Sequence, residues 1–357
     1  MTTSALTVEG ARLKRPSFAF DLAVLVSSLW FFGGLLLDGW AHNHLDLSKE
    51  GFFTPYHAVF YSGFAALATV LGVASWRNRM PGKPWYAAFP EGYGTMVAGV
   101  AIFAVGGALD MLWHIVFGVE QDVQALFSPT HLLLAVGGAT MMCGPIRIGL
   151  ARPNDGTWRA RFPELIALSF FATLVTFFLM WAFSTGAGIA NDPHRTYPAL
   201  RGDALADFRD LQVQNGIAAV ILRSLVIAGI TGFAGRRMTL PFGAITLLIA
   251  APNVLIALML NPAWSSLLIT LAAALVAGLA GDVTLQRRHG LLDGSSWRSR
   301  AFGFGLPFLF WAVYLSLAYV ASGGFWWSPH IAYGAPVIGG LAGLLLTLSG
   351  EARPPKH

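Results

Sequence analysis

Two segments of the chain carry the same pattern of acidic, imidazole and proline residues. Each copy reads Asp-x3-His and, after a gap, Phe-[Ser/Thr]-Pro-x-His-x5-Gly. The residues whose side chains could bind a metal or carry protons are Asp38, His42 and His57 in the first copy and Asp110, His114 and His131 in the second. Carboxylates and imidazoles bind transition metals and carry protons. Because the repeat preserves these residue types, it predicts a paired metal or proton-handling site.

The composition restricts the class of protein. The 357 residues are 55% hydrophobic and only 11% charged, with a mean hydropathy of +0.60, whereas soluble domains carry about 25% charged residues. We therefore expect an all-α polytopic membrane protein. A single cysteine, Cys143, excludes an internal disulfide and a cysteine-rich metal motif. The net charge of +5 does not indicate nucleic acid, because the arginines lie in short loops between apolar stretches.

Ten apolar stretches are long enough to cross a bilayer, which requires about 20 residues. They are 18–38, 56–75, 93–117, 129–147, 163–184, 215–234, 240–260, 265–283, 301–321 and 330–348. No small-x-small cleavage site follows the first stretch, so we expect a retained helix. The polar segment 185–214 is predicted to be a long outer loop.

The distribution of Lys and Arg predicts the orientation of these helices. Basic residues flank alternate ends of the stretches, and the side that they mark is expected to be cytoplasmic. Both termini then lie inside the cell, at the plasma membrane. Seven of the nine histidines fall on the outer side, and only His289 and His357 fall inside. Since the orientation uses Lys and Arg alone, the clustering of histidines is an independent observation.

Three predicted hairpins share a device at the start of the returning helix. Thr54-Pro55, Ser128-Pro129 and Ser328-Pro329 each offer an N-cap hydroxyl followed by a proline suited to the first helical position. A weaker relative is Asn261-Pro262. We divide the chain into 1–147 with the duplicated motif, 148–239 with two helices and the long loop, and 240–357, which is interpreted as a diverged repeat.

The spacing of the motif places its ligand-type residues together. Asp38 and His42, like Asp110 and His114, are four residues apart and share one helical face. Each hairpin thus offers one carboxylate and two imidazoles near the outer boundary. This set suits a copper, iron or zinc ion, and an open coordination position would make the site catalytic. The six groups could form two sites or one dinuclear centre.

Other interpretations of the motif stay open. The groups could form a metal-free proton network, purely structural hydrogen bonds, or histidine ligands of a b-type haem. Four further residues are candidates on weaker grounds. His44 and Glu120 lie close to the motif, His330 follows the third Ser-Pro pair, and Arg223 lies within an apolar stretch. An arginine within the membrane is a functional candidate by default.

The Asp-x3-His motif with a later histidine resembles the copper motif of the C subunit of copper membrane monooxygenases. That resemblance covers Asp110, His114 and His131, and separately Asp38, His42 and His57. It implies copper bound near the outer side. The family subunit has fewer helices and works with partner subunits. The sequence also has a looser similarity to alkaline ceramidase-like membrane hydrolases, which bind zinc, but it lacks their His-x3-His pair.

These observations predict a membrane metalloprotein with an outward-facing Asp/His site. The favoured function is a copper- or iron-dependent oxidoreductase that acts on an apolar small molecule dissolved in the lipid bilayer, in a pocket shaped by Trp and Phe. One alternative is a zinc-dependent hydrolase assisted by Ser128 or Thr54. Another is a metal-binding or transport protein without catalysis. The oligomeric state and the substrate are left open.

Overall fold

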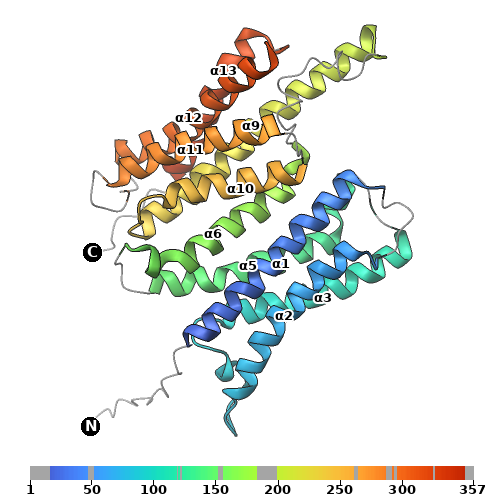
Figure 1. Ribbon diagram of the computed structural model, residues 1–357, viewed down its shortest axis with the longest axis vertical. Helices are drawn as coiled ribbons and strands as arrows, with labels where there is room; N and C mark the ends of the chain where they lie inside the picture. Colours follow the sequence, from blue (N-terminus) through green and yellow to red (C-terminus); the bar gives the residue numbers. More distant parts are fainter. Residues whose placement is uncertain are drawn as a thin grey trace, which may run out of the picture.

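The computed structural model describes residues 17–46, 52–118, 120, 123–151, 156–182, 199–260, 264–286, 292, 296–324 and 326–349. Within these ranges the regular elements are helices (Figure 1). They are α1 (Phe18–His44), α2 (Pro55–Arg77), η1 (Trp85–Ala88), α3 (Gly94–Phe117), α4 (Gln124–Phe127), α5 (Pro129–Ala151), α6 (Trp158–Phe178), η2 (Met180–Ala182), α9 (Gly202–Arg237), α10 (Ala244–Leu260), α11 (Trp264–Gln286), α12 (Trp297–Ser322) and α13 (Pro329–Ser349).

The long helices have the length and composition of membrane spans. Among the described residues, nine helices are long and apolar enough to cross a membrane, and α10 is a shorter apolar helix of 17 residues. These ten helices occupy the ten predicted stretches. Large apolar side chains such as Leu112, Val320 and Leu345 point outward, as expected where the solvent is lipid. The predicted class, an all-α polytopic membrane protein, is confirmed.

The predicted outer loop is wrong in its second half. Helix α9 begins at Gly202, well before the expected start near 215, and continues without interruption for 36 residues to Arg237. Hydropathy identifies only the apolar part of a helix, whereas the polar turns before it are helical as well. Helix α9 contains no proline, and the negative charge of Asp203 in its first turn stabilises the helix at its N-terminus. The earlier loop residues, including His194, lie outside the described residues.

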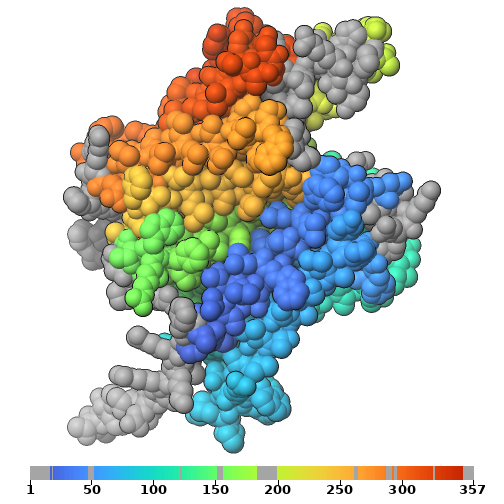
Figure 2. Space-filling view, in the orientation of Figure 1, coloured from blue at the N-terminus to red at the C-terminus, as the bar shows by residue number. Residues whose placement is uncertain are grey.

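The helices pack mainly as hairpins of neighbours in the chain. Helix α1 packs against α2, α3 against α5, α10 against α11, and α12 against α13. Helix α6 contacts both α5 and α10, so it joins the N-terminal hairpins to the C-terminal helices (Figure 1). In the space-filling view the blue surface of α1 and α2 lies directly beside the green surface of α6 (Figure 2). The N-terminal hairpins therefore form one side of a continuous helical assembly.

Within each of the two N-terminal hairpins, the two helices are held together by glycine contacts at corresponding positions. In each hairpin, two glycines face the partner helix at close range; a Cβ atom on Gly34, Gly63 or Gly137 would clash with backbone, and one on Gly106 would be tight against Leu134. The contacts are Gly34 with Phe60 and Gly63 with Phe31 in the first hairpin, and Gly106 with Leu134 and Gly137 with Phe103 in the second. Gly63 and Gly137 are the glycines that end the two copies of the sequence motif. The motif therefore carries packing information as well as chemical groups.

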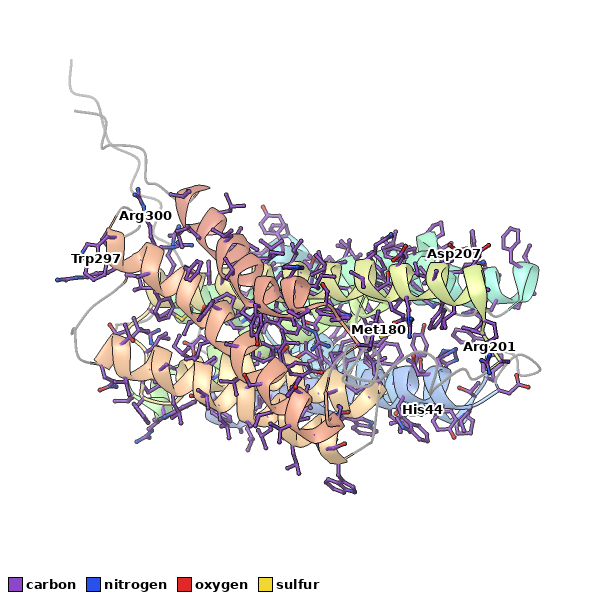
Figure 3. All side chains as sticks on the ribbon, turned by 90° about the horizontal axis from the view of Figure 1, so that it is seen from above. His44, Met180, Arg201, Asp207, Trp297 and Arg300 are labelled. Carbon is purple, nitrogen blue, oxygen red and sulfur yellow. The ribbon has the colours of Figure 1, made fainter. Side chains whose placement is uncertain are left out.

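The ends of the helices separate into two groups. Figure 3 shows His44 at the end of α1, Met180 after α6, and Arg201 and Asp207 at the start of α9 gathered at one end of the molecule. Trp297 and Arg300, at the start of α12, lie at the opposite end. The sequence assigned these two groups to opposite sides of the membrane, and their separation in space agrees with that assignment.

The glycine contacts lead to a stability prediction. A Cβ atom on Gly63 would lie 2.6 Å from the Cα atom of Phe31, whereas one on Gly72, on the same helix, would meet nothing within 4 Å. We expect Gly63→Val to lower the free energy of unfolding by about 1–3 kcal/mol, because α1 and α2 must move apart. Gly72→Val should not. Thermal unfolding of the two variants in detergent checks this, and equal losses would contradict it.

Candidate metal centre

Each candidate ligand is positioned by a helix end. Asp38 and His42 lie one turn apart near the end of α1, and Asp110 and His114 lie in the same way near the end of α3. His57 and His131 are the third residues of α2 and α5, directly after the predicted Pro starts. The caps predicted at Thr54 and Ser128 are present, no side-chain cap bond is formed by Ser328 in the described part of the chain, and Asn261-Pro262 lies outside the described residues. The Thr54 hydroxyl accepts a hydrogen bond from the His57 backbone N–H at 3.0 Å, and Ser128 accepts one from His131 at 3.3 Å.

The structure brings the six predicted residues into two triads. In the first triad, Oδ2 of Asp38 lies 3.4 Å from Nε2 of His57 and 3.9 Å from Nε2 of His42. In the second, Nε2 of His131 lies 3.2 Å from Oδ1 of Asp110, and Nε2 of His114 lies 3.6 Å from Oδ2. Within each triad one potential ligand atom per residue lies within 4.8 Å of the others. Each triad can therefore surround a single metal ion.

The far nitrogens of three histidines are already engaged. Nδ1 of His57 lies 2.6 Å from the Phe52 carbonyl, and Nδ1 of His131 contacts the Ala125 carbonyl. Nδ1 of His114 lies 3.3 Å from both the Glu120 carboxylate and the Gly118 carbonyl. Since carbonyls and carboxylates only accept, each Nδ1 must donate a proton.

This arrangement determines what the near nitrogens can do. A neutral imidazole that donates from Nδ1 carries a lone pair on Nε2. Here that lone pair faces a carboxylate oxygen, so two acceptors meet at 3.2 Å between His131 and Asp110 and at 3.4 Å between His57 and Asp38. The contact is favourable only with a cation between them, which is either a proton held by the ring or by the carboxyl group, or a bound metal ion. Metal-ligating histidines characteristically donate their other nitrogen in this way.

Two buried ligand atoms have no hydrogen bond among the described residues. They are Oδ1 of Asp38 and Nε2 of His114. Leaving a buried polar atom without a partner costs about 1–3 kcal/mol, and such atoms require an explanation. Both atoms belong to the triads, so the donor set fits a metal ion that would satisfy them.

The two triads lie next to each other. The ring centroids of His57 and His114, from different hairpins, are 6.3 Å apart, and those of His114 and His131 are 5.7 Å apart. His57 and His131 therefore lie within roughly 15 Å, the span of two ligand spheres with ~2 Å metal–nitrogen bonds and their side chains. Tyr61 connects the hairpins directly, since its hydroxyl donates a long hydrogen bond of 3.5 Å to Oδ2 of Asp110.

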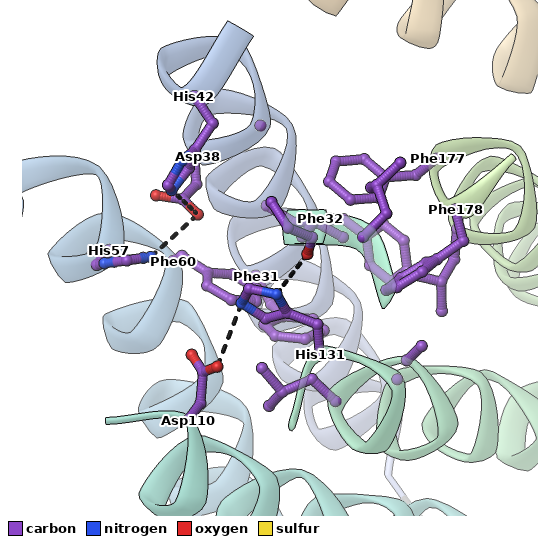
Figure 4. Close-up of a pocket in the computed structure, with 18 of the residues that line it drawn as sticks. Phe31, Phe32, Asp38, His42, His57, Phe60, Asp110, His131, Phe177 and Phe178 are labelled. Carbon is purple, nitrogen blue, oxygen red and sulfur yellow. Dashed lines mark hydrogen bonds and ion pairs between the residues drawn. The ribbon is translucent and has the colours of Figure 1, made fainter. Parts of the chain in front are cut away.

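An apolar cavity adjoins the triads. Its volume is about 90 Å³, and it is partly open to the surroundings. Its polar end is formed by the first triad with Asp110 and His131 (Figure 4). Its remaining lining is largely apolar and includes Phe31, Phe32, Phe60, Phe103, Leu134, Leu174, Phe177 and Phe178. The expected contribution of Phe to the pocket is present, whereas none of the Trp residues in the described part of the chain lines it.

The weaker candidates have separate outcomes. Glu120 joins the second triad from outside, at the far nitrogen of His114. His44 is exposed and stacks on Trp40, and His330 is exposed on α13, which packs mainly on α12 and α9. Arg223 is buried on α9 but does not line the cavity. The structure therefore adds Glu120 to the site and leaves the other three outside it.

Sequence reasoning missed several groups that support the triads. These are Tyr61 and Thr130 on Asp110, the Phe52 carbonyl on His57, and the Ala125 carbonyl on His131. Thr130 could have been found from the sequence, because it is a hydroxyl residue that lies next to His131 inside the Ser-Pro-x-His motif. The backbone carbonyls have none, because every residue has one. The short helix α4, which carries Ala125, was not predicted either.

The chain matches no model of a protein family, no curated protein and no solved structure. The geometry of the two triads therefore provides the argument for function.

The capping hydroxyls lead to a second stability prediction. Thr54→Ala removes the buried side chain that holds the start of α2 at His57, so we expect a loss of about 1 kcal/mol in the free energy of unfolding. Ser62→Ala is the matched control, because its exposed hydroxyl bonds only to the Val59 carbonyl within the same helix. Chemical unfolding in detergent measures both. An equal effect of the two changes would show that the cap does not stabilise this helix start.

Proposed function

We propose that this protein is a membrane metalloprotein that holds two metal ions, one in each Asp/His triad. The observation that carries the proposal is the contact between bare Nε2 nitrogens and carboxylate oxygens in buried positions. The imidazole and carboxylate set suits copper, iron or zinc and does not suit Ca²⁺, which prefers oxygen ligands. Three protein ligands per ion leave coordination positions open, as catalytic sites require.

We further propose that the metal is copper or iron and that the protein is an oxidoreductase. The apolar cavity beside the triads supports this, because it can admit an apolar molecule from the bilayer to the open side of the ligands. When bound, copper or iron supplies electron-transfer chemistry that the side chains lack. The protein residues hold the ion, orient the imidazoles through their Nδ1 contacts, and exclude water with the phenylalanine wall. The resemblance to the monooxygenase motif favours copper.

Both alternative functions receive less support. A zinc hydrolase assisted by Thr54 or Ser128 would use hydroxyls that here cap helices as acceptors. A transporter would place its ionisable residues near the middle of the bilayer, whereas the triads lie close to helix ends. Metal identity discriminates further, since copper or iron favours redox chemistry and zinc favours hydrolysis.

Two proposals concern the architecture of the site. The shared motif and the corresponding glycine contacts support an origin of the two hairpins as a duplicated unit with approximate two-fold symmetry. The basic residues support a site on the outer face of the plasma membrane with both termini in the cytoplasm.

Elemental analysis of the detergent-purified protein tests the metal directly. We expect about two equivalents of copper or iron per chain after reconstitution. Failure to retain copper, iron or zinc, each supplied in turn, would end the metalloprotein proposal and leave a proton network as the leading function.

A pair of histidine variants tests the location of the metal. His114→Ala removes a buried ligand and should lower the bound metal by about one equivalent. His330→Ala removes an exposed histidine on α13 and should leave the metal content unchanged. Membrane insertion should be preserved in both, because neither residue packs the centre of a helix. Equal metal content in the two variants would place the ion elsewhere.

Cysteine labelling tests the orientation. In a Cys143→Ser background, Phe53→Cys reports on the end of the molecule that carries the triads, and Trp297→Cys reports on the opposite end. Both native side chains are exposed, at 86% and 68% respectively. An impermeant thiol reagent added to intact cells should label position 53 and spare position 297. The reverse pattern would place the site inside the cell.

A further inference from the structure

The two aspartates differ in their outer contacts. Asp110 accepts a hydrogen bond of 2.8 Å from the Thr130 hydroxyl and one of 3.5 Å from Tyr61. Oδ1 of Asp38, by contrast, has no hydrogen-bond partner among the described residues. Both aspartates are buried. One carboxylate is therefore fixed by neutral donors, and the other has only its own histidines.

The cause of this difference lies in the sequence. When the two copies of the motif are aligned on their second histidines, Thr130 corresponds to Tyr56 and Tyr61 corresponds to Ala135. Neither Tyr56 nor Ala135 donates a hydrogen bond to Asp38 in the described part of the structure. These two differences between the copies of the motif thus leave the Asp38 site without either donor.

The first histidines of the two triads differ in the same direction, whereas in the second histidines the order of exposure is reversed, with 7% of the His57 side chain and 21% of the His131 side chain exposed. Nδ1 of His114 hydrogen-bonds the Gly118 carbonyl at 3.3 Å and lies 3.3 Å from the Glu120 carboxylate, and only 2% of the His114 side chain is exposed. His42, its counterpart, has no acceptor for Nδ1 among the described residues, and 25% of its side chain is exposed. All three residues of the Asp38 triad line the apolar cavity, whereas His114 does not. The Asp38 site is therefore the one whose three ligands all line the cavity, whereas the Asp110 site has one ligand that does not.

We propose that the two sites have different roles: the Asp110 site binds its metal tightly, and the Asp38 site binds more weakly and accepts a small exogenous ligand from the cavity. This inference rests on the proposed metalloprotein function. Groups that fix metal ligands from outside raise metal affinity by about 10–100-fold, and only the Asp110 site has them on its aspartate and on both histidines. Thr130, Tyr61 and Glu120 are accordingly positioning residues.

Titration of the chelator-stripped, full-length protein in detergent with Cu²⁺ tests the difference in affinity. We expect two binding phases separated by at least about tenfold in Kd. His114→Ala should abolish the tight phase and His42→Ala the weak phase. A single phase in which two equivalents of Cu²⁺ bind with equal affinity, or loss of the tight phase in His42→Ala, would overturn the inference and leave the metalloprotein proposal intact. The absence of any Cu²⁺ binding would overturn both.

Positioning variants test the cause. Thr130→Val keeps the shape of the side chain and removes the hydroxyl, so it should weaken the tight phase about tenfold without affecting the weak phase. Tyr61→Phe should act in the same direction. Tyr56→Phe is the matched control, because it removes the hydroxyl at the position that corresponds to Thr130 and should leave both phases unchanged. An unchanged tight phase in Thr130→Val and Tyr61→Phe would overturn the assignment of these residues.

Azide serves as a probe for the exchangeable site. Added to the protein with both sites filled by Cu²⁺, it should produce a ligand-to-metal absorption band. The band should be retained in His114→Ala, where only the Asp38 site is filled, and lost in His42→Ala. A band that survives in His42→Ala would show that the Asp110 site takes the ligand, contrary to the proposal.

Discussion

The contact between an imidazole lone pair and a buried carboxylate is the constraint on which the site depends. Backbone carbonyls take the Nδ1 protons of His57 and His131, and this fixes both rings with their bare nitrogens toward an aspartate. Two acceptors in contact repel each other unless a cation lies between them. A charged or unsatisfied group near the bilayer is expensive to keep, so the arrangement is stable only with a proton or metal ion in place. The helix caps, the short helix α4 and the close hairpin packing all maintain this contact.

Close helix packing within each hairpin is what allows each of these contacts to form. The glycines of each hairpin let one helix backbone approach the next, and this aligns Asp38 with His57 and Asp110 with His131. Phe31, Phe60 and Phe103 form part of the hydrophobic core and also line the cavity. The Phe31 ring stacks on Phe60 and meets Phe103 edge to face. The sequence motif therefore contains both the candidate metal ligands and the glycines that the helix packing requires.

Matching hairpins do not produce matching sites. Donors at two positions, Thr130 and Tyr61, fix the carboxylate of the second triad, and the corresponding residues of the first triad leave its carboxylate with an unsatisfied oxygen. Under the proposed function, such a pair of sites keeps one ion for structure and exposes the other to a substrate. The apolar cavity meets the less constrained triad along all three of its ligands, which connects the difference in outer contacts to the proposed chemistry.

The sequence by itself determined the class of protein, the ten apolar helices, the capped helix starts and the six triad residues, because composition and short-range spacing control these features. It also overextended the outer loop, since the polar first turns of α9 carry no hydropathy signal. Only the tertiary structure decided that the triads adjoin, that Glu120 supports His114 from outside, and that His330 and His44 stay apart. These features depend on contacts between distant helices and on backbone carbonyls, which no residue pattern specifies.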